Sequence, residues 1–385
     1  MKIGIFGGTF NPPHQGHLQA ARAAIAALAL DRLYVIPTKT PPHKILPEGT
    51  PAPEVRYHLA QILFAEEPVA EVLDLELQRP GLSYTLDTVL EIRRLHPESE
   101  LYLLLGTDMF LSLDFWDRVE ELLPLVTPSV FARADGQREA IVAYAKQLQV
   151  RYGAAFRLID HEVLELSSTE IREILSARGG LELVGEALYS ELIRGRYYDA
   201  KPDFAWLREK AFLQNPRRQA HTEGTEEEAI RLATYWGADV GEAREAAILH
   251  DITKGLDSGE QLRLCEKYGM MPDIQERENG KLLHAISGAG LARAEFGVCE
   301  AVFEAILYHT TGRPGMTLLD KVLYTADYIE PNRNFAEVSK LRELAYTDLD
   351  AAVAYGLALT AEALREKGAA QHPRSKAAAE WFLQR

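Results

Sequence analysis

Cysteine is scarce in this sequence, and long apolar runs and an excess of basic residues are missing. Only two cysteines occur among 385 residues, and neither Cys265 nor Cys299 has metal-ligand spacing, so a disulfide framework and a cysteine-based zinc site are not indicated. The 57 acidic residues outnumber the 42 basic ones and give a formal charge of −15, which argues against a general nucleic-acid binder. No apolar stretch approaches membrane-spanning length, and the first residues do not form a signal peptide. We therefore expect a cytoplasmic protein without nucleic-acid or membrane partners.

The residues that are present form two halves with different periodicity. Up to about residue 187, apolar runs of strand length alternate with helix-like segments, which predicts a Rossmann-like parallel sheet covered by helices. From about Phe204 onward the periodicity is helical throughout, with Gly and Pro at the breaks. We therefore predict an α/β domain over residues 1–195, followed by an all-α domain over residues 204–385.

The turn GGTFNPPHQGH separates the first predicted strand from an alanine-rich helix. His14 and His17 are three residues apart, so at the start of a helix their imidazoles share one face. Free backbone N–H groups and the helix dipole favour an anion at that place, and phosphate is the natural ligand. Zinc binding by the two histidines is a competing interpretation that lacks a third ligand nearby. A tight connection without a ligand is the structural alternative.

This turn resembles the HxGH signature of the nucleotidylyltransferase superfamily. Later segments narrow the resemblance to the bacterial nicotinate-nucleotide adenylyltransferases, whose motifs follow in the same order over roughly residues 1–190. The resemblance implies that AMP passes from ATP to nicotinate mononucleotide, giving deamido-NAD and pyrophosphate, with Mg²⁺ as the cofactor. The segments are IPTKTPPHK, SYTLDT, GTDMFLSLDFW and LSSTEIR.

The resemblance also implies roles for individual residues of the first half. His14, His17 and Arg172 are the expected catalytic residues, because they would neutralise phosphate charge. The expected ATP-binding residues are Gly7, Gly8, Thr9, Phe10, Gly106, Asp108, Ser168, Thr169 and Arg172. The expected nicotinate mononucleotide-binding residues are Lys39, Lys44, Thr85, Trp116 and Arg133.

Several of these residues also have plain structural interpretations. Asp108 can cap the following helix, and Trp116 can belong to the core. LSSTEIR has the pattern of a helix capping box, with Ser167 three residues before Glu170. The family usually has Arg-Pro-Gly where this chain reads Arg133-Ala134-Asp135, so the resemblance is weaker at that point.

The helical half contains histidines and aspartates in the order H, HD, H, H, D. Three of the histidines, His250, His284 and His309, end or interrupt apolar segments, where an unpaired polar group would be costly to bury. Metal coordination removes that cost, and nitrogen and oxygen donors without thiolates suit a first-row divalent ion. The candidate ligands are His221, His250, Asp251, His284, His309 and Asp327.

This set resembles the HD-domain phosphohydrolases, specifically the bacterial symmetrical bis(5′-nucleosyl)-tetraphosphatases, through the motifs LHDITKG, YHTTG and YTADYIEPNR. The resemblance implies two divalent metal ions, with iron as the first choice, Asp251 as their bridge, and cleavage of diadenosine tetraphosphate into two ADP. Lys254 is then a catalytic candidate, and Lys254, Arg313 and Arg333 are candidate polyphosphate ligands, although all three also suit an ordinary charged surface. Hydrolysis of another nucleotide polyphosphate, or a metal-stabilised nucleotide sensor without turnover, are the alternatives. The sequence sets neither the physiological metal nor the oligomeric state.

Overall fold

The computed structural model describes residues 1–42, 45–132, 135–160 and 167–384. The chain divides into two compact units, Met1–Lys201 and Pro202–Arg385. The first contains a parallel sheet with helices and the second is helical, so the predicted fold classes are confirmed. Residues 196–201, which follow the predicted end of the first domain, belong to the first unit.

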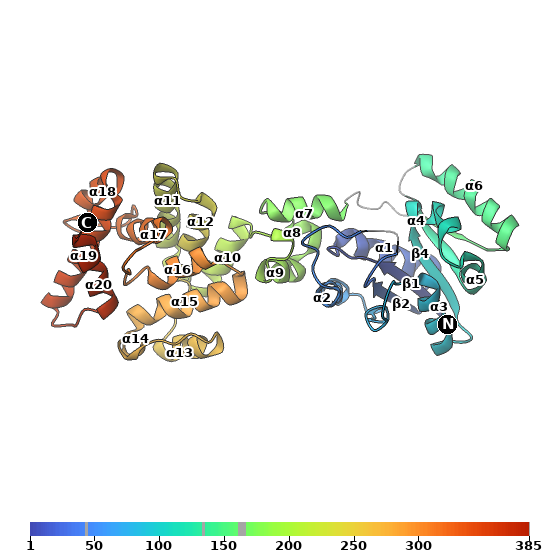
Figure 1. The fold of residues 1–385 in the computed structure, drawn as a ribbon, viewed down its shortest axis with the longest axis horizontal. Coiled ribbons are helices and arrows are strands. Elements are labelled where there is room, and N and C mark those ends of the chain that lie inside the picture. Colours follow the sequence, from blue (N-terminus) through green and yellow to red (C-terminus); the bar gives the residue numbers. More distant parts are fainter. Residues whose placement is uncertain (43–44, 133–134, 161–166, 385) are drawn as a thin grey trace. The chain divides into compact units, whose positions relative to one another are not determined.

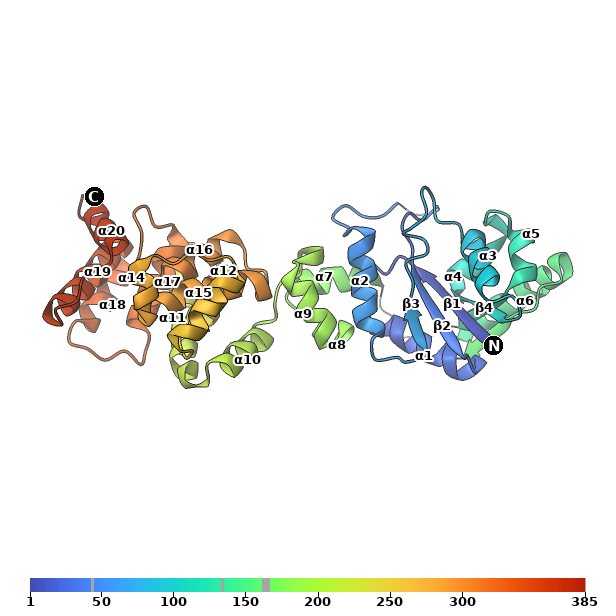
Figure 2. The same ribbon diagram turned by 90° about the horizontal axis from the view of Figure 1, so that it is seen from below.

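A six-stranded parallel sheet forms the centre of the first unit (Figures 1 and 2). Its order is β3-β2-β1-β4-β5-β6, so the direction of winding reverses between β1 and β4. Such a reversal leaves a crevice at the carboxyl ends of the two strands, where open α/β sheets bind ligands. The strands are β1 (Lys2–Gly8), β2 (Arg32–Pro37), β3 (Ala70–Val72), β4 (Glu100–Gly106), β5 (Thr127–Ala132) and β6 (Arg157–Asp160).

Strand β3 is shorter than the sequence run EVLDLEL suggests. The strand ends at Val72, and the backbone N–H of Leu77 then donates to the carbonyl of Asp74 in a turn. The second half of this run therefore alternates apolar and acidic residues without belonging to a strand. The turn that follows lies beside the candidate site described below.

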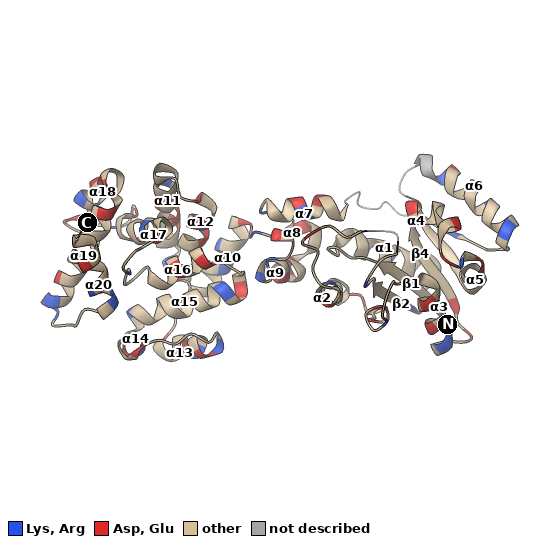
Figure 3. Cartoon of the chain, in the orientation of Figure 1, with Lys and Arg blue, Asp and Glu red and all other residues tan. Residues whose placement is uncertain are grey.

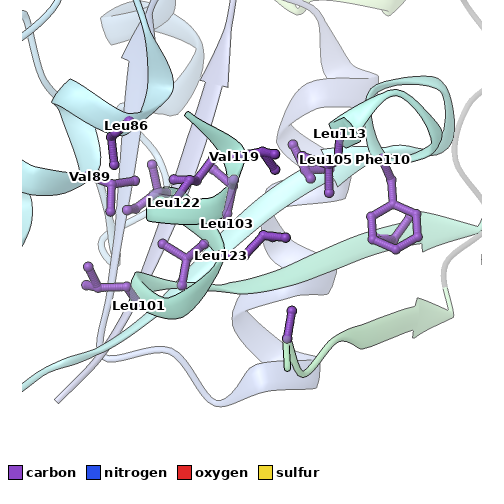
Figure 4. Close-up of a cluster of buried hydrophobic side chains, with 14 of the residues drawn as sticks. Leu86, Val89, Leu101, Leu103, Leu105, Phe110, Leu113, Val119, Leu122 and Leu123 are labelled. Carbon is purple, nitrogen blue, oxygen red and sulfur yellow. The ribbon is translucent and has the colours of Figure 1, made fainter. Parts of the chain in front are cut away.

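Alternation along β1 places its side chains on opposite faces of the sheet. Ile3 and Ile5 join a buried cluster with Leu86 and Val89 of α3, and much of this cluster is visible in Figure 4. Gly4 between them faces the other way, where an added Cβ would lie 2.6 Å from Leu30. The helices of this unit are α1 (Gln15–Leu28), α2 (Pro53–Phe64), α3 (Thr85–Leu95), α4 (Thr107–Leu111), α5 (Val119–Leu122), α6 (Asp135–Tyr152), α7 (Ser168–Ser176), α8 (Leu181–Val184) and α9 (Glu186–Arg194).

Helices of moderate length build the second unit. In the described part of the chain, none of the helices combines the length and apolarity needed to cross a membrane. Acidic and basic positions are scattered over the helices of both units (Figure 3). The helices are α10 (Phe204–Gln214), α11 (Gln219–Trp236), α12 (Val240–Leu249), α13 (Ser258–Lys267), α14 (Ile274–Glu278), α15 (Gly280–Phe296), α16 (Glu300–Tyr308), α17 (Leu318–Ile329), α18 (Val338–Thr347), α19 (Leu349–Glu366) and α20 (Pro373–Leu383).

Candidate active sites

A cavity of about 930 Å³ opens at the carboxyl ends of β1 and β4 in the first unit. Gly7 and Gly8 at the end of β1 line it, as does Gly106 at the end of β4. A Cβ added to Gly7 would meet nothing within 4 Å, so this glycine leaves room for a ligand close to the backbone. The predicted glycine turn therefore lies at the crevice that the sheet topology creates.

His14 and His17 lie together at the start of α1. His14 is the N-cap residue, and its carbonyl accepts a 2.9 Å hydrogen bond from the backbone N–H of His17. The two ring centroids are 3.8 Å apart, and both residues line the cavity. The first N–H groups of a helix are not used within that helix, so the pair stands beside a positive dipole end. This arrangement suits the phosphate contact predicted for the two histidines.

Thr9 and Phe10 also line the cavity, and they belong to the turn between β1 and α1. Phe10 has φ of 45°, in the left-handed region that a residue with a side chain rarely adopts. Its ring is buried and lies 5.0 Å from the ring of His17, centroid to centroid. The turn therefore stores backbone strain next to a candidate catalytic residue.

The N-terminus of α7 reaches the same cavity. The Ser167 hydroxyl and the Glu170 carboxylate cap it reciprocally, as the LSSTEIR pattern predicts. Hydrogen bonds from the Ser167 backbone and side chain lower the pKa of Glu170. Ser168 lines the cavity beside them, whereas Thr169 is exposed and accepts a 2.9 Å hydrogen bond from Arg172.

Arg172 connects α7 with the strained turn. Its guanidinium donates to the carbonyl of Asn11 at 2.7 Å. Arginine has five N–H donors, so this bond leaves others for a phosphate. The structure thus places Arg172 beside the turn of His14 and His17, although the two segments are far apart in the sequence.

The residues predicted to bind nicotinate mononucleotide lie in different surroundings. Thr85 at the start of α3 and Trp116 both line the cavity. Lys39 instead donates to the carbonyls of Leu77 and Arg79, at 2.9 and 3.2 Å. Lys44 and Arg133 lie outside the described residues. Asp108, predicted to contact ATP, is exposed in the first turn of α4.

Glu76 is a cavity residue that the sequence reasoning missed. Burial raises the pKa of its carboxyl, although hydrogen bonds from Thr88 and Ser83 act in the opposite direction. Its Oε1 accepts from Thr88 at 3.0 Å, and Oε2 has no hydrogen-bond partner among the described residues. Glu76 lies in the turn after β3, where no periodicity marks it as buried.

All six predicted ligands of the second unit come together. They lie on α11, α15 and α17 and in the residues directly after α12 and α16. The Oδ2 of Asp251 is 3.6 Å from Nε2 of His221 and 3.4 Å from Nε2 of His250. Its Oδ1 is 3.0 Å from Nε2 of His284 and 3.6 Å from Nε2 of His309. One carboxylate therefore faces a histidine pair with each oxygen.

Asp327 completes the cluster on the side of His221. Its Oδ1 is 3.0 Å from Nε2 of His221 and 3.9 Å from Nε2 of His250. Within this cluster, three groups of donor atoms lie close enough to hold an ion: His221, His250 and Asp251; His250, His309 and Asp327; and Asp251, His284 and His309. The donor set fits a divalent first-row metal, because it offers imidazole nitrogens and carboxylate oxygens in a buried place.

Hydrogen bonds hold the far sides of three of the four histidine rings, whereas Nδ1 of His284 has no hydrogen-bond partner among the described residues. His250 donates from Nδ1 to the carbonyl of Ala247, and His309 donates from Nδ1 to that of Ile306, both at 2.7 Å. Nδ1 of His221 is 3.2 Å from the buried carboxylate of Glu330. These contacts fix the rings with Nε2 toward the cluster, as in metal sites where an outer hydrogen bond orients each ligand. The sequence reasoning missed Glu330, which follows α17.

Electrostatics keep the two aspartates of the cluster ionised. Against the effect of burial, Asp251 raises the pKa of His250, so this imidazole has to release its proton when a metal binds. Burial alone would raise the pKa of Asp251, but His250 and His284 hold it well below its usual range. Burial likewise opposes ionisation of Asp327, and His221 keeps its pKa well below normal. Burial lowers the pKa of His284 to about 4. Carboxylates that stay ionised and an imidazole that stays neutral are the forms that bind cations.

Three basic side chains surround the two aspartates. Arg218 donates to Oδ2 of Asp251 at 2.6 Å and Lys254 to the same atom at 3.0 Å, while Arg333 donates to Oδ1 of Asp327 at 2.6 Å. Their side chains are 27%, 32% and 34% exposed, so a phosphate can reach them. Arg218 was not predicted.

Arg313, also predicted as a phosphate ligand, has other partners. Its guanidinium pairs with Glu304 and Asp320, each at 2.8 Å, and lies 4.7 Å from the ring centroid of Tyr308. A polyphosphate would have to compete with these two carboxylates. Its predicted role stays a prediction.

Comparison with known proteins first defines the class. The family of cytidylyltransferase-like proteins matches residues 5–174, and the HD domain family matches residues 218–332. Fold and sites together thus define a nucleotidylyltransferase-like unit joined to an HD-domain unit.

Individual relatives make the assignment more specific. The chain is 37% identical over 177 residues to a probable nicotinate-nucleotide adenylyltransferase of Clostridium novyi, covering 46% of this chain and 88% of the relative. It is 41% identical over 167 residues to the symmetrical bis(5′-nucleosyl)-tetraphosphatase of Bacillus subtilis, covering 43% of this chain and 89% of the relative. A solved structure from Clostridium acetobutylicum, titled a predicted HD superfamily hydrolase involved in NAD metabolism, is 32% identical with a TM-score of 0.46, covering 48% of this chain and 99% of its own. The chain belongs to the nicotinate-nucleotide adenylyltransferase family and carries an HD domain in the same polypeptide, so the predicted fusion is confirmed.

Proposed function

We propose that the first unit transfers the AMP portion of ATP to nicotinate mononucleotide. The observation that carries this proposal is that the histidine pair, the N-terminus of α7 and Trp116 all line the same cavity. The Clostridium novyi relative is a probable enzyme of this activity. The products are deamido-NAD and pyrophosphate.

The reaction requires the two substrates to be aligned more than it requires the attacking phosphate to be activated. A phosphate oxygen of the mononucleotide attacks the α-phosphorus of ATP, a new P–O bond forms, and the bond from that phosphorus to the pyrophosphate oxygen breaks. Because a phosphate is already a nucleophile, the protein has to position the reactants and neutralise charge. We assign this neutralisation to His14, His17 and the N–H groups at the start of α1, and assign Arg172 and the start of α7 to the leaving pyrophosphate.

Magnesium fits this cavity as an ion that arrives with ATP. Mg²⁺ usually keeps several waters and binds through one or two carboxylates plus substrate phosphates. Glu170 and Asp117 are carboxylates of the lining that such a complex can meet. When bound, the ion would reduce the charge of the triphosphate.

The pyridine end of the substrate is assigned to Trp116 and Thr85. An indole beside the cavity provides a stacking surface for an aromatic ring. The first N–H groups of α3, which begins at Thr85, suit the nicotinate carboxylate.

Chromatography of deamido-NAD tests the first activity. The purified full chain is incubated with ATP, Mg²⁺ and nicotinate mononucleotide, and in parallel with nicotinamide mononucleotide. We expect one pyrophosphate released for each deamido-NAD formed. A folded chain that forms neither dinucleotide contradicts the proposal.

We propose that the second unit is a metal-dependent hydrolase that cleaves diadenosine tetraphosphate into two ADP. The observation that carries it is Asp251, whose two carboxylate oxygens each face a pair of histidines. The Bacillus subtilis relative bears the name of this activity.

Two ions would share the six ligands. We assign His221, His250, Asp251 and Asp327 to one ion, and Asp251, His284 and His309 to the other. Nitrogen and oxygen donors without thiolate suit iron, manganese, zinc or another first-row divalent ion, and the resemblance to the tetraphosphatases makes iron our first choice. When bound, a metal pair supplies an activated nucleophile and stabilises charge on phosphoryl oxygens. Arg218, Lys254 and Arg333 stand where they can bind the remaining phosphates.

A substrate panel with metal analysis tests the second activity. The full chain is loaded separately with iron, manganese, zinc or magnesium and given diadenosine tetraphosphate, guanosine polyphosphates and deoxynucleoside triphosphates. We expect two ADP from the first substrate and about two bound ions per chain. Preferred turnover of another substrate would favour a different HD-type reaction, and binding without turnover would favour a sensor.

A further inference from the structure

Arg56 on α2 is the largest fully buried side chain among the residues that the structure describes, with 0% of its surface exposed. Burial lowers the pKa of its guanidinium, while Tyr198 and Glu54 favour the charged form. A buried cation is costly unless hydrogen bonds replace its lost hydration.

Three backbone carbonyls from separate segments accept hydrogen bonds from Arg56. Nη1 donates to Thr9 at 2.6 Å, Nη2 to Lys39 at 3.2 Å and Nε to Pro51 at 3.3 Å. Thr9 precedes the strained residue Phe10, whereas Lys39 follows β2. The planar guanidinium of Arg56 therefore links the turn that contains Thr9 to the segment that follows β2.

The strained residue is held from both sides. Arg56 binds the carbonyl of Thr9, before Phe10, and Arg172 binds the carbonyl of Asn11, after it. A left-handed conformation at a residue with a large side chain persists only where the surroundings over-determine it. The two guanidinium groups hold the backbone on both sides of Phe10 and so support its left-handed conformation.

Tyr198, which falls between the two domains predicted from the sequence, lies close enough to both arginines to interact with them electrostatically. It is 8% exposed, and both Arg56 and Arg172 counter the rise in its pKa that burial causes. The backbone N–H of Lys201, just beyond it, donates to the carbonyl of Leu175 at 3.0 Å. Residues 196–201 thus pack against α7, the helix that carries Arg172.

We propose that Arg56 is a positioning residue for adenylyl transfer: it fixes the Thr9–Asn11 turn, and through it His14 and His17, relative to the Lys39 segment, with Tyr198 completing its enclosure. This inference rests on the proposed function of the first unit. Lysine offers a single ammonium and cannot span three carbonyls in one plane, so Arg56→Lys should not fully replace arginine.

Kinetics of Arg56→Met and Arg56→Lys test the proposal against Arg22→Met and Arg22→Lys. Arg22 is a matched control because it is 48% exposed and pairs with Glu67 in the same unit. We expect kcat of Arg56→Met to fall about 100-fold, as misplacement of reacting groups by roughly 1 Å does, with smaller changes in KM. Arg56→Lys should lie between this variant and the wild type. A purely stabilising arginine would lower the melting temperature and leave kcat of the folded protein unchanged, and that result overturns the proposal.

Hydrogen exchange gives a readout that does not depend on activity. In Arg56→Lys, peptides covering residues 7–13 and 38–42 should exchange faster together, while those of the Arg22 variants match the wild type. If Arg56→Met does not fold, Arg56→Lys decides by the same measurements. A wild-type chain without adenylyl transfer would refute the proposed function of the first unit. Hydrogen exchange would still test whether Arg56 fixes the two segments. Unchanged exchange in both segments of a folded Arg56 variant overturns it.

Discussion

The two candidate sites solve the problem of binding phosphates in opposite ways. The cavity of the first unit is open, and most of its expected phosphate contacts are neutral or partial charges: glycine backbone, helix N-termini and two imidazoles. The second site is a buried cluster of ionised carboxylates and histidines that suits cations first and phosphates through them. On the proposed functions, an acidic chain would bind polyanions by local dipoles and Arg172 in one unit, and by metal ligands with three basic side chains in the other.

The largest effect on activity is expected for Asp251→Ala in the second site. Asp251→Ala removes the carboxylate that faces all four histidines, so we expect hydrolysis to fall below detection and bound metal to fall from about two ions toward one or none. Adenylyl transfer should persist, which separates the two sites. Metal analysis and both assays measure this.

Asp350→Ala is the matched control for that variant. Asp350 pairs with Lys321 at the protein surface, 42% exposed, and should keep metal and hydrolysis. Normal metal content in folded Asp251→Ala would contradict the dinuclear assignment.

The first site should respond to loss of one imidazole. His17→Ala removes a proposed donor to the transition state, and such a loss typically lowers the rate about 100- to 1,000-fold, or roughly 2.7 to 4 kcal/mol. We expect that fall in adenylyl transfer, little change in melting temperature and unaltered hydrolysis. Steady-state kinetics beside thermal unfolding would measure it.

His58→Ala controls for the general effect of losing a histidine, because the side chain of His58 is 55% exposed in the same unit. If His17→Ala and His58→Ala turn over at similar rates, the turn is only a connection between strand and helix.

Truncation tests where the first unit ends in the sequence. Residues 1–201 should retain adenylyl transfer with magnesium and without iron or manganese, since the cavity lies wholly within them. Residues 1–195 lack Tyr198 and should lose about 2 kcal/mol of stability, the usual value for one large buried side chain. Denaturant unfolding of both fragments tests this, and equal stability would show that residues 196–201 are dispensable.

The smallest effect is expected at the cap of α7. Ser167→Ala removes the side chain that accepts from the backbone N–H of Glu170, and loss of such a cap costs about 1 kcal/mol. Ser176→Ala in the last turn of the same helix is the control. A fall in stability without a change in KM for ATP would separate the cap from the nucleotide site.

Sequence patterns predicted what is local or strongly periodic. The strand-to-helix turn, the capping box at Ser167 and the burial of His250, His284 and His309 all follow from residue type and spacing, and the structure has each of them. The histidines were identifiable because a polar residue in an apolar helix requires a partner.

Residues whose role depends on tertiary contacts with the backbone were missed. Arg56 reaches a carbonyl 47 residues away and has the appearance of an ordinary charged residue at the start of a helix. Arg218 and Glu330 lie beside recognised ligands, but neither position carries a periodic signal. Lys39 resembled a free cation in a proline-rich loop, although its ammonium is held by two carbonyls. Such contacts leave no trace in a single sequence.

The hydrogen bond between His221 and Glu330 joins residues 109 positions apart. The histidine pair of the first unit, by contrast, lies within one helical turn and exists as soon as α1 forms. Contacts between distant segments cost more conformational entropy to form, because the intervening chain loses its freedom. The ligand set of the HD domain is therefore complete only when α17 is docked against α11, so we expect the proposed metal binding to require that docking.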